Sequence, residues 1–154
     1  MSAKDEAKYI VAGAIFALLL YKLIGVALGT PMPVVAVLSD SMIPSIYPGD
    51  AVVICGWCKI HVGDVIVFDA AKKGCRDAYG RLITSPIIHR VIRINPDGTF
   101  ETKGDHNLWQ IKGCENEIPR KYVYGKAILK LPALGWPKKI LTDLISFFIQ
   151  GNNL

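Results

Sequence analysis

An almost unbroken apolar stretch, residues 9–29, restricts the fold of this 154-residue chain more than any other feature. As an α-helix rising about 1.5 Å per residue, it would span roughly 31 Å, the thickness of a bilayer's hydrocarbon core. A removable signal peptide is the alternative, but its apolar part is only ~7–15 residues long and Lys22 would interrupt the approach to a cleavage site. The sequence therefore predicts an uncleaved transmembrane helix, with residues 1–29 as a membrane anchor.

The charges around this stretch predict its orientation. Lys4 and Lys8 precede the apolar stretch, whereas residues 30–53 contain no lysine or arginine. Because cytoplasmic flanks of membrane helices are rich in these residues, we expect a single-pass protein of the cell membrane with a cytoplasmic N-terminus and the remaining chain outside, or in the lumen of an internal membrane. Lys22 either extends its long side chain to the far interface or contacts a neighbouring chain.

Residues 30–135 have the pattern of a mainly β domain. Short runs rich in valine and isoleucine alternate with turn sequences such as Pro48-Gly49-Asp50. We expect an antiparallel sheet behind the membrane helix, and we expect no chemistry from the polar loop at residues 70–86. The candidate strands are residues 34–38, 51–55, 65–68, 87–94, 99–103 and 122–129.

Residues 136–154 form a third segment. Its apolar run, residues 140–149, contains Asp143 and is too short to cross a membrane. The pattern predicts a short amphipathic helix that either lies on the membrane surface or packs against the β domain.

The charged residues and cysteines narrow the function classes. The net charge of +5 is spread along the chain without a basic run interleaved with aromatic residues, so we expect no nucleic-acid site. Four cysteines suit two disulfides in an oxidising compartment, with Cys55–Cys58 or Cys75–Cys114 as options, or a four-thiolate zinc site in a reducing one. A membrane-anchored thiol or zinc module is therefore one alternative. A redox C-x-x-C motif works best at a helix N-terminus, however, and this one lies between predicted strands.

Two serines, Ser39 and Ser41, follow the first predicted strand. In an extended backbone, residues two apart point to the same side, so the two hydroxyls can converge while Asp40 points away. Pro44 keeps Ile43 out of the helical region, which argues against the strand-to-helix nucleophile elbow of α/β-hydrolases. The pattern suits either a nucleophile with a second hydroxyl beside it or a polar strand end.

The turn Asn95-Pro96-Asp97-Gly98 predicts a contact between a histidine and a carboxylate. Proline and glycine occupy the positions typical of a three-residue hairpin loop with a bulge. If Asn95 pairs with Thr99, the register sets His89 opposite Asp105, with Cβ atoms about 5 Å apart. Asp105 would then orient an imidazole, which is a suitable base because the ordinary pKa of histidine, about 6.5, leaves it mostly neutral at pH 7. A loop of two or four residues would shift the register and separate the two.

Four short motifs follow the apolar stretch in this order: Ser39-Asp40-Ser41-Met42-Ile43-Pro44, Gly63-Asp64-Val65-Ile66-Val67-Phe68, Ile88-His89-Arg90-Val91 and Thr102-Lys103-Gly104-Asp105. In these motifs the chain resembles the type I signal peptidases, in particular the archaeal and endoplasmic-reticulum branch. The resemblance implies a serine endopeptidase that removes signal peptides from secretory preproteins. Ser41 would be the nucleophile, His89 the general base where the bacterial branch has lysine, and Ser39 a hydroxyl donor to the oxyanion hole.

The same resemblance implies the substrates and partners. Preproteins would carry small residues one and three positions before the cut, and would bind as an added strand with their side chains in shallow pockets formed by residues 34–37. Membrane lipid and the protein-translocation machinery would be partners. Neither a metal nor a cofactor is implied.

The sequence departs from the family pattern at one position. The family carries a further aspartate six positions beyond Asp105, where this chain has Ile111. We interpret Asp105 as the acid that orients His89. The alternatives are that Glu115 or Glu117 reaches back to the histidine, or that the chain is a catalytically inactive relative that binds signal sequences.

Overall fold

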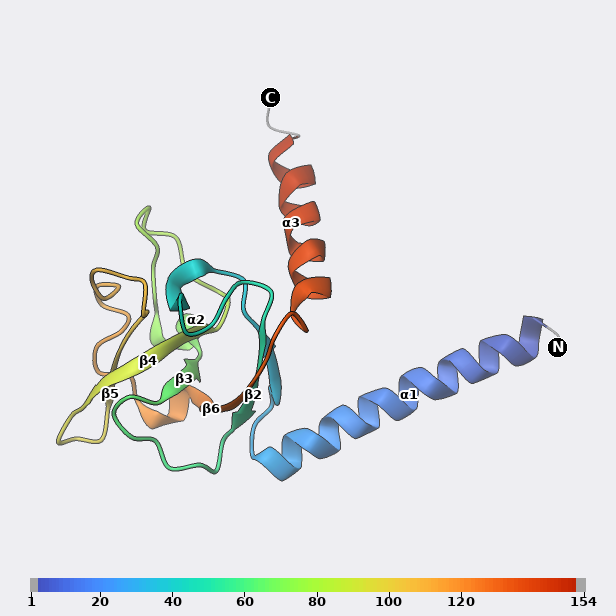
Figure 1. Ribbon diagram of the computed structural model, residues 1–154, viewed down its shortest axis with the longest axis horizontal. Coiled ribbons are helices and arrows are strands. Elements are labelled where there is room, and N and C mark those ends of the chain that lie inside the picture. The colour runs from blue at the N-terminus through green and yellow to red at the C-terminus, as the bar shows by residue number, and fades with distance from the viewer. Residues whose placement is uncertain (1–2, 152–154) are drawn as a thin grey trace.

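The computed structural model, in which residues 3–151 are described, consists of a six-stranded antiparallel sheet with a long N-terminal helix and a shorter C-terminal helix (Figure 1). The strand order is β1-β2-β6-β3-β4-β5, so β1 and β5 are the two edges. The mainly β fold, the N-terminal helix and the short C-terminal helix are confirmed. In chain order the elements are α1 (Ala3–Leu28), β1 (Val34–Ala36), η1 (Asp40–Met42), β2 (Ala51–Cys55), β3 (Val65–Phe68), α2 (Ala70–Lys73), β4 (Ile87–Ile94), β5 (Phe100–Lys103), η2 (Arg120–Tyr122), β6 (Val123–Leu131) and α3 (Trp136–Gly151).

Helix α1 extends away from the sheet and presents its apolar side chains to the surroundings (Figure 1). Asp5–Leu28 is long and apolar enough to cross a membrane, with a mean hydropathy of 2.3. The helix ends at Leu28, and the next residue, Gly29, has a φ of +64°, which suits a glycine directly after a helix. Such an exposed apolar helix requires apolar surroundings, which lipid supplies in a membrane protein.

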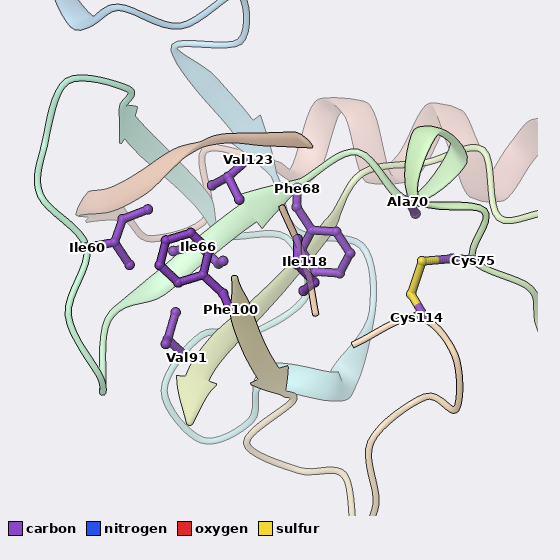
Figure 2. Close-up of a cluster of buried hydrophobic side chains, with 10 residues drawn as sticks. All are labelled: Ile60, Ile66, Phe68, Ala70, Cys75, Val91, Phe100, Cys114, Ile118 and Val123. Atoms are coloured by element: carbon purple, nitrogen blue, oxygen red, sulfur yellow. A yellow bond between two sulfur atoms is a disulfide. The ribbon is translucent and has the colours of Figure 1, made fainter. Parts of the chain in front are cut away.

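The sheet buries apolar side chains on both faces. Successive residues of a strand point to opposite faces, so Ile66 and Phe68 of β3 join one cluster while Val67 joins the other. Figure 2 shows the first cluster, which consists of Ile60, Ile66, Phe68, Ala70, Cys75, Val91, Phe100, Cys114, Ile118 and Val123. The second consists of Val35, Val37, Met42, Ile46, Val52, Ile54, Val67 and Ile88, and therefore anchors the segment on both sides of Ser41.

The four cysteines form two disulfides, Cys55–Cys58 and Cys75–Cys114. No thiolate is left for the zinc site that the cysteine count allowed. Within residues 3–151 no group of histidine, cysteine, aspartate and glutamate side chains could hold a metal ion.

Helix α3 begins at Trp136, which packs beside Gly49 at the end of the turn before β2. Ile140, Leu141, Leu144 and Ile145 are all at least half exposed. The helix thus contacts the β domain at Trp136, while these four apolar side chains are left largely uncovered.

Candidate active site

The residues of the predicted Ser-x-Ser pair lie beyond the end of β1. Ser39 is extended, but Ser41 belongs to the 3₁₀ turn η1, so the extended backbone expected for both serines is wrong for Ser41. The chain leaves the sheet early because serine and aspartate side chains compete for backbone hydrogen bonds and favour turns. Met42 is fully buried and anchors this turn in the core. The two hydroxyls nevertheless converge, with 3.1 Å between Ser39 Oγ and Ser41 Oγ.

His89 reaches Ser41 from β4, the strand next to the edge strand β5. It lies near the start of β4 and is 3% exposed. Its Nε2 atom is 3.0 Å from Ser41 Oγ, and its Nδ1 atom is hydrogen-bonded to Oε1 of Glu115. With Nδ1–H donating to a carboxylate, Nε2 carries the lone pair and can accept the serine proton.

Glu115 is fully buried, and both of its carboxylate oxygens accept hydrogen bonds. The Oε1 atom accepts from His89 and from the hydroxyl of Thr102 at 3.2 Å, while Oε2 accepts from the backbone N–H of Ile111 at 2.6 Å. Buried carboxylates are stable only when they are hydrogen-bonded in this way. Ile111, which stands where the family has its second aspartate, thus contributes a backbone N–H to the acid.

The predicted contact between His89 and Asp105 is wrong. The hairpin begins in the expected register, with Ile94 opposite Phe100 and Arg93 opposite Glu101. A bulge between Val91 and Arg93 then shifts the pairing by one residue, so that Arg90 lies opposite Lys103. A shift of one residue exchanges the two faces of the sheet, and this turns Asp105 away from His89.

Asp105 instead pairs with Arg90. The arginine donates from Nε at 2.8 Å and from Nη2 at 2.6 Å to the two carboxylate oxygens. This bidentate bond lowers the pKa of Asp105 and raises that of Arg90. Arg90 also donates to the carbonyl of Gly63 at 2.7 Å and to Ser45 Oγ at 3.0 Å, so it holds the segment after Ser41 against the end of β5.

A cleft of about 280 Å³ opens beside Ser41 and His89. Of the four residues expected to line it, Val35, Ala36 and Val37 do so, and Val34 does not. Further lining residues come from the loops before β4 and after β5, among them Ile83, Ser85, Pro86, Asn107 and Ile111, and Lys138 of α3 also contributes. The loop at residues 70–86, from which we expected no chemistry, therefore supplies part of the cleft.

Sequence reasoning found Ser39, Ser41 and His89, and named Glu115 only as an alternative to Asp105. In the structure Glu115 directly follows Cys114 of the Cys75–Cys114 disulfide, and both residues are buried. Glu117 is exposed.

A hydroxyl, an imidazole and a buried carboxylate joined in one chain of hydrogen bonds form the arrangement by which serine hydrolases activate a nucleophile. Here the arrangement lies on an antiparallel sheet behind an apolar N-terminal helix, without a nucleophile elbow. The fold and the site together thus fit a membrane-anchored serine hydrolase.

No sequence model of a protein family matches the chain. Over 141 residues it is 34% identical to the human "Signal peptidase complex catalytic subunit SEC11C", covering 85% of this chain and 68% of the relative. It is 34% identical over 127 residues to the corresponding SEC11 subunit of Plasmodium falciparum, covering 77% of this chain and 64% of the relative. The SEC11 subunit of Chaetomium globosum is 27% identical over 140 residues, or 82% of this chain and 74% of the relative. The chain belongs to the signal peptidase family, in the branch of these catalytic subunits, and the resemblance read from its motifs is confirmed.

Proposed function

We propose that this chain removes signal peptides from secretory preproteins with Ser41 as the nucleophile, His89 as the general base and Glu115 as the acid that orients the histidine. Signal peptide removal is the activity of the family, whose members are serine-type peptidases. The observation that carries the residue assignment is the continuous hydrogen-bonded path from Ser41 Oγ through the imidazole to the Glu115 carboxylate. Asp105, which the sequence favoured, serves Arg90 in this proposal.

The reaction follows from this geometry. His89 Nε2 takes the proton from Ser41 Oγ as the oxygen attacks the carbonyl carbon of the scissile bond. The imidazolium, stabilised by Glu115, then gives that proton to the leaving amine, and the signal peptide remains as an acyl group on the serine. Water, deprotonated by His89, attacks the acyl carbon and releases the signal peptide. No cofactor takes part in these steps.

The oxyanion of each tetrahedral intermediate needs hydrogen-bond donors near Ser41. We assign this role to the hydroxyl of Ser39, 3.1 Å from the nucleophilic oxygen, and to the backbone N–H of Ser41. Such donors act at the position where negative charge develops, so they stabilise the transition state more than the bound substrate.

Substrate binding is proposed along β1. This strand is an edge of the sheet, so an extended peptide can add to it through backbone hydrogen bonds. The cleft beside Val35 and Val37 is lined largely by apolar side chains, and we assign to it the small side chains one and three positions before the cut.

The membrane arrangement extends the proposal. We place the N-terminus in the cytoplasm and the β domain outside or in a lumen, because Lys4 and Lys8 lie at the N-terminal end of α1 and because disulfides persist in oxidising compartments. The exposed apolar row of α3 would lie on the membrane surface. The relatives are subunits of a complex, so we include partner subunits and the translocation machinery among the contacts of this chain.

The proposal is tested by cleavage of a preprotein with the full chain reconstituted in lipid vesicles. We expect the intact chain to release a mature product with a single new N-terminus, and Ser41→Ala to release none while remaining folded by circular dichroism. Thr99→Ala is the matched control, because it removes a hydroxyl at the far turn of the β4–β5 hairpin. Cleavage by Ser41→Ala at the control's rate would overturn the nucleophile assignment.

A further inference from the structure

We propose that the Cys75–Cys114 disulfide is a positioning element of the active site, which holds Glu115 against His89, so that full activity requires this disulfide. The inference rests on the proposed function, because it assigns Glu115 to the reaction. The disulfide would then position Glu115 in addition to stabilising the fold.

The acid lies in a segment with little regular structure of its own. Residues 104–119 form no helix or strand, apart from one bridge between Ile118 and Phe100. The segment is held to β5 by backbone bonds, including Thr102 N–H to the carbonyl of Glu115 at 2.9 Å. These bonds fix the acid along the strand. The disulfide adds a connection to a different part of the domain.

That connection is made one residue before the acid. Cys114 directly precedes Glu115, and its backbone N–H donates to the carbonyl of Ile111 at 3.1 Å, within the turn whose own N–H binds the carboxylate. Both sulfur-bearing residues are buried, Cys75 at 1% exposure and Cys114 at 0%. Figure 2 shows the disulfide at one end of the buried cluster, near Ala70 of α2. A shift of Cys114 would therefore move both the carboxylate and its backbone donor.

The partner cysteine is itself fixed. Cys75 donates its N–H to the carbonyl of Ala70 at 2.9 Å and accepts from the N–H of Ile83 at 2.9 Å. It is thereby tied to the first residue of α2 and to Ile83, a residue of the cleft. Ile83 and Ile111, on the two joined segments, both line that cleft. The disulfide thus joins the segment that carries Glu115 to a segment that is itself held by two backbone hydrogen bonds at Cys75.

One consequence concerns where the enzyme can work. Disulfides form on the oxidising side of a membrane and are rare in the cytosol. The active site would therefore be completed only after the β domain has crossed the membrane, which is also where signal peptides are to be removed.

The test is a double-mutant cycle between Cys75→Ala/Cys114→Ala and Glu115→Gln, measured as kcat and KM for preprotein cleavage in vesicles. With Glu115 present, we expect removal of the disulfide to lower kcat at least about tenfold, since a misplacement near 1 Å can cost about 10²-fold. With Glu115→Gln already in place, the same removal should change kcat by no more than about twofold, because the group being positioned is gone. A disulfide that only stabilises the fold would give equal factors in both backgrounds.

Cys55→Ala/Cys58→Ala is the matched control, since that disulfide lies at the end of β2 and neither of its residues lines the cleft. If this control and the intact chain both fail to cleave, the proposed function is wrong. If they cleave and Cys75→Ala/Cys114→Ala cleaves at the same kcat, only the present inference is overturned.

The buried cysteines contribute to packing, so the alanine variant could unfold. In that case the Cys55→Ala/Cys58→Ala chain is assayed before and after reduction of its remaining disulfide by a phosphine, at a temperature where circular dichroism shows the reduced chain to be folded. We expect kcat to fall on reduction and to recover on reoxidation. An unchanged kcat in the reduced, folded chain would overturn the inference.

Discussion

The hydroxyls of Ser39 and Ser41, 3.1 Å apart, have different roles in the proposed reaction, and substitution of Ser39 alone tests the role of its hydroxyl. Removing the Ser39 hydroxyl should lower kcat by about 10²–10³-fold with little change in KM, which is the usual effect of losing one oxyanion donor. Ser39→Thr, which retains a hydroxyl, should keep more activity than Ser39→Ala. Steady-state kinetics on the reconstituted chain measures this, and equal kcat values for Ser39→Ala and the intact chain would contradict the assignment.

The Arg90–Asp105 pair makes a separate, pH-dependent contribution to stability. Its hydrogen bonds lower the pKa of Asp105 in the folded chain. A group with a lowered folded pKa stabilises the fold above its unfolded pKa, and the contribution disappears as the pH falls through the folded value. Asp105→Asn should therefore lower the free energy of unfolding by about 1–3 kcal/mol at neutral pH.

This difference should shrink as the pH falls below about 4, the ordinary pKa of aspartate. Denaturant unfolding of both chains in detergent, monitored by circular dichroism across the pH range, provides the measurement. A stability difference that stays constant down to pH 2 would show that the carboxylate charge is not its cause.

Among the secondary-structure elements, the β4–β5 hairpin shows which parts of the structure could be predicted from the sequence. Proline and glycine in the turn predicted its loop, and the pairing of Arg93 with Glu101 follows as expected. The bulge beside Ile92 has no signal in the sequence, because bulges depend on packing against both neighbouring strands. Because of this one extra residue in β4, Asp105 does not lie opposite His89 as predicted.

Glu115 was harder to assign for a related reason. Strand positions and turn residues are local properties, whereas the approach of Glu115 to His89 depends on a long segment and on a disulfide between residues 39 apart in the chain. The serines and the histidine lie on or next to regular strands, and their positions could therefore be inferred from the sequence.

Gly104, directly after β5, lies close to Ser41 and His89, and a substitution there tests how closely these residues pack. A Cβ atom at Gly104 would lie 2.6 Å from the carbonyl oxygen of Ser41 and 2.9 Å from His89 Nε2. Gly104→Ala should therefore separate the nucleophile from its base and lower kcat by about 10²-fold, since small displacements of reacting groups have effects of this size. Cleavage kinetics measures the loss, and circular dichroism checks that the sheet remains. A rate within about threefold of the intact chain would show that the junction has room.

At the level of the whole molecule, the orientation of α1 decides which compartment contains the cleft. The basic residues at the N-terminal end of α1 predict that the β domain of a chain inserted into sealed vesicles during synthesis is protected from added protease. Detergent should remove this protection. Digestion of the β domain without detergent would contradict the proposed orientation.

The most direct test of the account is the rate of preprotein cleavage by Glu115→Gln. The amide keeps the shape of the side chain but cannot stabilise the imidazolium, so kcat should fall by about 10²–10⁴-fold with KM nearly unchanged. Glu117→Gln, which alters an exposed glutamate of the same segment, should cleave at the rate of the intact chain. If Glu115→Gln, correctly folded and inserted, cleaves as fast as Glu117→Gln, Glu115 is not the acid of this active site.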